Sequence, residues 1–200
     1  VGDWVAITEH DDMAIIHQLL PRLSQFSRKA VWTKRFEQVI AANIDTLFLV
    51  SALNQEFNLR RLERYLVIIK NCGIQPVLIL NKADLCSDPV PFIRSIQEIA
   101  SSLPLYIISC RTQQGIKELE DDLTVGQTIA LIGSSGVGKS SLLNILMGEN
   151  KQIVDSLRND DRGHHTTSHR ELFRLPSGTL LIDTPGMREL QLWDDGDGVR

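Results

Sequence analysis

The stretch Gly133-Ser134-Ser135-Gly136-Val137-Gly138-Lys139-Ser140 matches the pattern GxxxxGK[ST]. An apolar run from Thr128 to Ile132 comes directly before it, and a segment of helical pattern from Lys139 to Gly148 follows. This order of strand, loop and helix is the context that a phosphate-binding P-loop requires. The glycines let backbone N–H groups converge on phosphate oxygens at the positive end of the helix. The stretch therefore predicts an α/β fold with a phosphate site at the end of a strand.

The polar residues of this loop have separate predicted roles. We expect Lys139 to reach the β and γ oxygens of a nucleotide and the Ser140 hydroxyl to ligate Mg²⁺. Ser141 extends the predicted nucleotide contacts by one residue. The alternative is a glycine-rich turn that binds nothing, and the flanking strand and helix argue against it.

The composition is that of an ordinary globular chain. The 200 residues are 42% hydrophobic and 23% charged, with a net charge of -4. These values disfavour disorder and exclude binding of nucleic acid by bulk charge. The longest apolar run, residues 46–53, is far shorter than the roughly 18 residues of a membrane helix. The start of the chain has no signal-peptide pattern, so we expect a cytoplasmic protein, and the missing initiator Met suggests a fragment.

Short apolar runs alternate with amphipathic stretches between residues 45 and 132, which is typical of βα units around a parallel sheet with helices on both faces. Two more strands, near Glu171 to Leu175 and Thr179 to Ile182, are joined by a Pro-Ser-Gly turn. The expected parallel strands are Thr46 to Val50, Pro76 to Leu80, Leu105 to Ile108 and Thr128 to Ile132. The expected helices are Leu59 to Ile69, Val90 to Ser101, Ile116 to Leu123 and Lys139 to Gly148, the last ended by a glycine suited to a left-handed cap.

The first 40 residues have all-β character instead. Trp4 to Ile7 and Ala14 to Ile16 are predicted strands separated by a polar turn. Two or three strands cannot bury a stable core alone, so they either complete a small barrel outside this chain or pack on the α/β domain. We therefore divide the chain into a β segment, residues 1–40, and an α/β domain, residues 41–200.

Asn81-Lys82-Ala83-Asp84 follows the strand Pro76 to Leu80 and so lies at the carboxyl edge of the sheet, where ligands bind in open α/β folds. The Asp84 carboxylate can accept both the ring N–H and the exocyclic amine of guanine, whereas adenine offers no such pair of donors. Asn81 and the Lys82 stem would support this site. Ser109-Cys110, after the next strand, could present a backbone N–H to the guanine carbonyl oxygen. For an isolated match an Asx-type turn would be the better interpretation.

Asp183-Thr184-Pro185-Gly186 follows the last predicted strand. This position suits Asp183 to hold the metal, usually through water, and the Gly186 N–H to approach a γ-phosphate. The motif is weak on its own, and the P-loop in the same chain strengthens it.

Most guanine-nucleotide domains carry the P-loop first and the base motif near the end, whereas here the base motif comes first. With this order the chain resembles the circularly permuted, ribosome small-subunit-dependent GTPases (RsgA/YjeQ). Besides the P-loop, the resemblance rests on residues 38–43 (QVIAAN), 57–65 (FNLRRLERY), 162–172 (RGHHTTSHREL) and 183–189 (DTPGMRE).

This resemblance implies a partial OB-fold segment, a circularly permuted P-loop GTPase domain, and a role in late maturation of the small ribosomal (30S) subunit. It also implies a zinc module, which we expect only beyond Arg200. GTP or GDP and Mg²⁺ are the implied ligands, and the small subunit with its rRNA is the implied partner.

Hydrolysis of GTP needs a group that orients the attacking water. Met187 occupies the place where many GTPases carry a glutamine, and a thioether cannot make that hydrogen bond. The switch histidine of the family falls on His165, although His164 and His169 compete for the role. Thr166 or Thr167 should meet Mg²⁺ and the γ-phosphate, and the sequence leaves open which of them does so.

The segment from Pro21 to Val39 is locally basic and contains interleaved aromatic residues. Such a segment suits contact with an RNA backbone and stacking on bases, although a solvated linker has the same composition. With the resemblance we favour RNA. The basic residues are Arg22, Arg28, Lys29, Lys34 and Arg35, opposed by Glu37 alone.

The sequence thus predicts a GTP-hydrolysing switch that the small subunit stimulates, with a monomer as the default state. Two alternatives stay open. One is a non-hydrolysing, guanine-nucleotide-gated RNA-binding scaffold, and the other is a permuted GTPase of large-subunit assembly.

Overall fold

The computed structural model describes residues 1–11, 13–29, 37–148 and 171–183. Its centre is a six-stranded sheet in the order β7-β6-β5-β8-β10-β9, in which every neighbouring pair is parallel except β10 and β9. This agrees with the predicted α/β class. The strands are β5 (Thr46–Ala52), β6 (Gln75–Asn81), β7 (Leu105–Ile107), β8 (Thr128–Ile132), β9 (Glu171–Arg174) and β10 (Leu180–Asp183).

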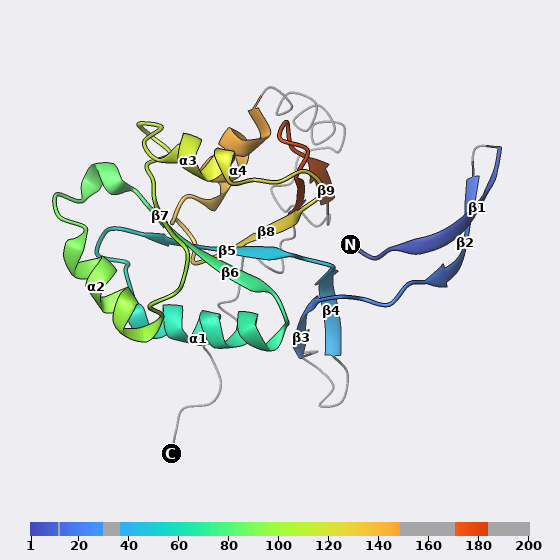
Figure 1. Ribbon diagram of the computed structural model, residues 1–200, viewed down its shortest axis with the longest axis horizontal. Helices are drawn as coiled ribbons and strands as arrows, with labels where there is room; N and C mark the ends of the chain where they lie inside the picture. Colours follow the sequence, from blue (N-terminus) through green and yellow to red (C-terminus); the bar gives the residue numbers. More distant parts are fainter. Residues whose placement is uncertain (12, 30–36, 149–170, 184–200) are drawn as a thin grey trace, which may run out of the picture.

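Helices cover both faces of this sheet (Figure 1). β5 is buried along its whole length, and its side chains alternate between two cores. Leu47 and Leu49 join the core beneath α1 and α2, whereas Phe48 and Val50 join the core beneath α3 and α4. A strand buried on both faces reads as a continuous apolar run, which is why the sequence predicted it correctly. The helices are α1 (Leu59–Asn71), α2 (Val90–Ile99), α3 (Ile116–Asp121) and α4 (Lys139–Met147), with a 3₁₀ turn, η1 (Ala83–Leu85).

Helix ends differ from the predictions by one or two residues. α2 ends at Ile99, two residues before the predicted Ser101, and α3 ends at Asp121, two residues before the predicted Leu123. The remaining residues belong to the following loops. The left-handed cap predicted after α4 is wrong, since Gly148 takes φ 52° and ψ −130°, outside the left-handed helical region. In the described residues, no helix is both long and apolar enough to cross a bilayer.

The N-terminal residues form two antiparallel hairpins, β1 (Val5–His10) with β2 (Met13–Leu19), and β3 (Gln25–Lys29) with β4 (Glu37–Ala42). The β3–β4 hairpin packs on the α/β domain, because Phe26 and Ile40 are buried in the core beneath α1. The β1–β2 hairpin projects away from the sheet (Figure 1) and is exposed along both strands apart from the half-buried Val5. The predicted boundary between residues 40 and 41 falls inside β4, and the division into two domains stays a prediction.

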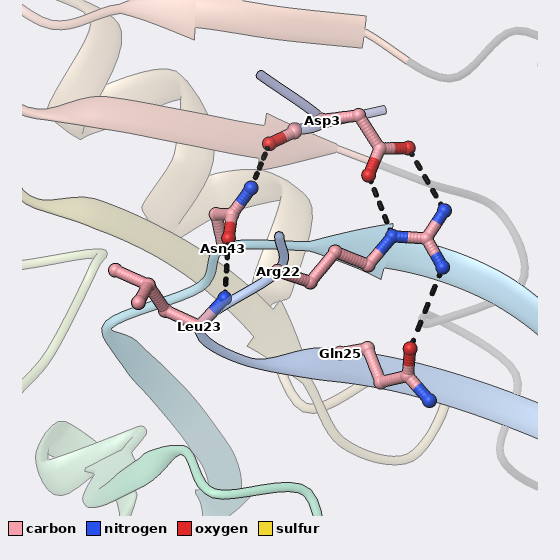
Figure 2. A network of polar contacts seen from close by, with 6 residues as sticks. Asp3, Arg22, Leu23, Gln25 and Asn43 are labelled. Carbon is pink, nitrogen blue, oxygen red and sulfur yellow. Dashed lines mark hydrogen bonds and ion pairs between the residues drawn. The ribbon is translucent and has the colours of Figure 1, made fainter. Parts of the chain in front are cut away.

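A polar network joins the first residues of the chain to the connection between β4 and β5 (Figure 2). Asn43 adopts φ 55°, and its side chain bridges two backbone groups: Nδ2 donates to Gly2 O at 2.8 Å, and Oδ1 accepts from Leu23 N at 2.9 Å. Beside it, Arg22 Nε donates to Asp3 Oδ1 at 2.6 Å, and this hydrogen bond lowers the pKa of Asp3. One amide therefore ties three segments together.

Replacing Asn43 tests this junction. Asn43→Ala removes both side-chain hydrogen bonds and places a residue that disfavours positive φ, so we expect the free energy of unfolding to fall by about 2–3 kcal/mol. Glycine tolerates the backbone conformation, so Asn43→Gly should lower the free energy of unfolding by less. Urea denaturation measures both, and an Asn43→Ala protein as stable as the parent would contradict this account of the junction.

Candidate functional site

The predicted motifs converge at the carboxyl edge of the sheet. The P-loop follows β8, Asn81 ends β6 and Asp183 ends β10. β5 and β10 both pair in parallel with β8, and β6 pairs in parallel with β5, so these strand ends meet at one edge. This is the edge at which open α/β sheets bind ligands.

Glycines shape the P-loop through two close approaches. Gly133, at φ 147°, lies against Val50 O of the neighbouring strand, where a Cβ would collide with that carbonyl. Gly138, at φ 101°, lies against the Asn81 amide nitrogen, which a Cβ would also meet. Both positions therefore require glycine, which holds the loop close to β5 and to the end of β6.

Lys139 and the start of α4 give this loop its positive potential. Lys139 is 9% exposed, and its Nζ donates to Gly133 O at 2.8 Å and Ser134 O at 2.5 Å. Those bonds hold the ammonium group against the loop. α4 has no side-chain cap and no acidic residue in its first turn, which leaves its N-terminus suited to an anion. Ser140 and Ser141 lie exposed in this first turn.

The Asn81 side chain connects the two predicted motifs. It is 2% exposed, and its Nδ2 donates to Val137 O of the P-loop at 2.8 Å. Its Oδ1 accepts from Cys110 N, after β7, at 3.1 Å. A single buried amide thus links the ends of β6, β7 and β8.

The chain turns sharply after Asn81, because Lys82 adopts the left-handed conformation at φ 66° and η1 follows. Within that turn, Asp84 Oδ1 accepts from Ser109 Oγ at 2.6 Å. The Arg111 guanidinium is 4.0 Å from Asp84 Oδ2, but the Arg111 side chain is 83% exposed, so solvent weakens the attraction. The Ser109 hydroxyl is therefore the group that orients Asp84.

The backbone N–H groups of Ser109 and Cys110 both have partners within the protein. The sequence had predicted that one of them could be presented to a guanine carbonyl oxygen. Ser109 N donates to Gln114 O at 3.0 Å, and Cys110 N donates to Asn81. A ligand oxygen at this point would share the Cys110 N–H with the Asn81 amide oxygen. Burial raises the pKa of the Cys110 thiol, and the nearby Asp84 carboxylate acts in the same direction, so the thiol is neutral here.

Asp183 at the end of β10 and Ser140 at the start of α4 carry oxygen donors of the kind that magnesium takes. Asp183 is 8% exposed at the end of β10, and Ser140 follows the P-loop lysine. A carboxylate and a hydroxyl are hard oxygen donors, and Mg²⁺ takes its other ligands from water and phosphate oxygens. The described residues hold no cluster of three or more His, Cys, Asp or Glu side chains suited to a metal.

A family model described as the RsgA GTPase matches residues 19–193. The chain belongs to the RsgA GTPase family. This agrees with the resemblance carried by the motifs and their order. The small ribosomal subunit biogenesis GTPase RsgA 2 of Lactiplantibacillus plantarum is 47% identical over 195 residues, which are 96% of this chain and 55% of that protein. The RsgA 2 of Vibrio parahaemolyticus is 46% identical over 200 residues, again covering 55% of the relative.

Solved structures of similar fold agree with this membership. YjeQ from Thermotoga maritima matches with a TM-score of 0.70 and 29% identity, over 95% of this chain and 62% of that one. YloQ, described as a circularly permuted GTPase, matches with a TM-score of 0.66 and 26% identity, over 97% of this chain and 59% of that one. The chain thus spans a little over half the length of its RsgA relatives.

Several predicted residues lie outside the described residues. They are the switch residues His164, His165, Thr166, Thr167 and His169, with Gly186 and Met187, and the basic residues Lys34 and Arg35. Arg28 and Lys29 are described only as backbone of β3. Their predicted roles stay predictions.

The loop between β5 and α1 had no predicted role, although residues 57–65 carry part of the family resemblance. A cavity of about 530 Å³ lies between this loop and the P-loop, lined by Gln55, Glu56, Phe57, Asn58 and Arg61 on one side and Ser134, Ser135 and Gly136 on the other. Sheet topology could have pointed to this loop, because the strand before it, β5, pairs with β8, the strand that leads into the P-loop.

Gly138→Ala tests the packing of the P-loop on Asn81. The new Cβ would displace the amide and strain a positive φ, so we expect the affinity for GDP to fall at least tenfold, about 1.4 kcal/mol. Gly126→Ala is the matched control, because Gly126 has φ 80° with open space around it. Titration calorimetry would contradict the account if both variants bound GDP as the parent does.

Proposed function

We propose that this protein binds guanine nucleotides and hydrolyses GTP as a switch in the biogenesis of the small ribosomal subunit. The observation that carries the proposal is the Asn81 amide, which joins a base-recognition motif to a P-loop in one site. Family membership supports it, because the matched relatives are named small ribosomal subunit biogenesis GTPases. A cytoplasmic location goes with this role.

Asp84 selects the base in this proposal. Its carboxylate would accept from the ring N–H and the exocyclic amine of guanine, while Ser109 holds it in place. Lys82, which begins the turn, and the Cys110 N–H complete the base site. Adenine lacks the paired donors, so ATP is a poor substrate.

The P-loop holds the phosphates in this proposal, with the N–H groups of residues 133–141 as donors. Lys139 would exchange its carbonyl partners for β and γ oxygens. Ser140 and Asp183 would hold Mg²⁺, which neutralises charge on the phosphates when bound. Thr166 or Thr167 would complete the metal site, the Gly186 N–H would meet the γ-phosphate, and His165 would orient the water.

The partner in this proposal is the small ribosomal subunit with its rRNA. The basic segment between Pro21 and Val39 supports contact with RNA, since its sequence holds five cations and one Glu. Arg22 is paired with Asp3, so the proposed contact rests on Arg28, Lys29, Lys34 and Arg35. We further propose that the protein acts as a monomer.

Asp84→Asn tests base recognition. The amide cannot accept from both guanine donors, and each charge-assisted hydrogen bond contributes about 1.5–3 kcal/mol, so GDP affinity should fall by about 100-fold or more. Xanthosine diphosphate should bind the variant better than it binds the parent, because xanthine presents a carbonyl where guanine has its amine.

Asp88→Asn is the matched control for this substitution. Asp88 lies in the next turn, and its Oδ1 accepts from Val90 N, a bond that asparagine keeps. If Asp84→Asn bound GDP and xanthosine diphosphate with the same affinities as the parent does, the role of Asp84 in base recognition would be contradicted.

Hydrolysis tests the proposed switch. The rate of GTP turnover by the intact protein is measured with and without purified small subunits, and the same two measurements are made on the Lys139→Ala variant. We expect stimulation by the small subunit that Lys139→Ala abolishes. Guanine-specific binding without turnover would favour a nucleotide-gated RNA-binding scaffold, and stronger stimulation by the large subunit would indicate large-subunit assembly. Either result contradicts the proposal.

A further inference from the structure

Arg61 lies at the start of α1 with its side chain turned back toward the preceding loop. Its backbone N–H donates to the Asn58 side chain, the cap of α1, at 3.0 Å. Its guanidinium Nη2 donates to Glu56 O at 2.7 Å, against the direction of the helix. The cation is therefore held at the carboxyl edge of the sheet, and not over the outer surface of α1.

The loop that holds Arg61 is itself fixed. Asn54 Oδ1 accepts from Glu56 N at 3.0 Å, and the ring of Phe57 packs edge-on against Phe92 at a centroid distance of 4.9 Å. The loop follows β5, which pairs with β8, the strand that leads into the P-loop. A rigid loop on the neighbouring strand thus faces the phosphate-binding loop.

Arg61 and the P-loop line the same cavity of about 530 Å³, whose opposite wall is Ser134, Ser135 and Gly136. The approach is close, because Glu56 Oε2 lies 3.9 Å from the point where a Cβ on Gly136 would be. Arg61 is the one cation among the residues that line this cavity. Arg61 therefore supplies a positive group in the cavity beside the phosphate loop, in addition to Lys139, and Glu56 is the one carboxylate in the same lining.

We propose that Arg61 is a catalytic residue that contacts the phosphate groups during hydrolysis of GTP. The inference rests on the proposed function. In that reaction the oxygen of water forms a bond to the γ-phosphorus while the bond to the β–γ bridging oxygen breaks. The electron pair of the broken bond stays on the β-phosphate of GDP, and a proton of the water passes to the inorganic phosphate.

The charge that builds on the phosphate oxygens in this step is what a guanidinium stabilises. Arg61 stays protonated throughout, and its planar fork can meet two oxygens at once. An arginine supplied within the same chain has this effect in other GTPases and raises turnover strongly. The role also gives a function to one residue of the stretch 57–65, which the base and phosphate motifs do not include.

The test compares Arg61→Ala, Arg61→Lys and Arg60→Ala in the intact protein. Arg60 is the matched control because it is exposed on the same helical turn and does not line the cavity. Three quantities are measured: GDP affinity, affinity for GDP with Mg²⁺ and aluminium fluoride, which mimics the transferring phosphoryl group, and the single-turnover rate of GTP hydrolysis.

We expect Arg61→Ala to bind GDP within about threefold of the parent but to hydrolyse GTP about 100-fold or more slowly. It should also lose the tighter binding that aluminium fluoride confers. The hydrolysis rate of Arg61→Lys should fall between those of the parent and Arg61→Ala, since an ammonium keeps the charge but lacks the planar fork. Arg60→Ala should match the parent. Arg61→Gln, which keeps a donor for Glu56 O, replaces the alanine variant if that protein does not fold.

A folded Arg61→Ala or Arg61→Gln protein that hydrolyses GTP within about threefold of a hydrolysing parent overturns the role of Arg61 and leaves the proposed function intact. A parent that binds GDP but never hydrolyses GTP overturns the proposed function, and the role of Arg61 with it.

Discussion

The buried amide of Asn81 is the interaction on which the site depends. It bonds to Val137 O, 56 residues later in the chain, and to Cys110 N, 29 residues later. In this order of motifs the base and phosphate elements come from separate βα units, so no short stretch of backbone holds them together. A buried amide with both ends satisfied fixes their distance and orientation. The glycine at position 138 is required because this amide lies against it.

The parts of the fold with a local cause were predictable from the sequence. β5 reads as a continuous apolar run because both faces are covered, and α1 shows the spacing of Leu62, Tyr65 and Ile69 that its buried side requires. The P-loop was predictable because its backbone geometry needs glycines at fixed positions. The parts set by tertiary contact were not. The hydroxyl of Ser109 on Asp84 and the engaged N–H of Cys110 depend on how neighbouring strand ends meet.

The N-terminal hairpins illustrate the same limit. The apolar runs of β1–β2 predicted those strands, whereas β3–β4 was not predicted, because β3 (QFSRK) holds a single apolar residue. Yet it is β3–β4 that buries side chains, such as Phe26 and Ile40, in the core of the α/β domain. Periodicity identifies a strand but does not say which sheet or core it joins. The network around Asn43 then brings the first residues of the chain to the connection that leads into β5, where Gly2 lies close to Ile182 of β10. The N-terminal segment therefore contacts the strand that ends in Asp183.

A crystal structure of the protein with GDP and Mg²⁺ tests the central claim most directly, namely that one nucleotide occupies both motifs across the Asn81 amide. The account predicts a single GDP whose base hydrogen-bonds to Asp84 and whose phosphates lie within residues 133–140, with the bond from Asn81 to Val137 intact. A diphosphate bound in the P-loop with its base turned away from Asp84, or a nucleotide bound elsewhere on the sheet, would contradict it.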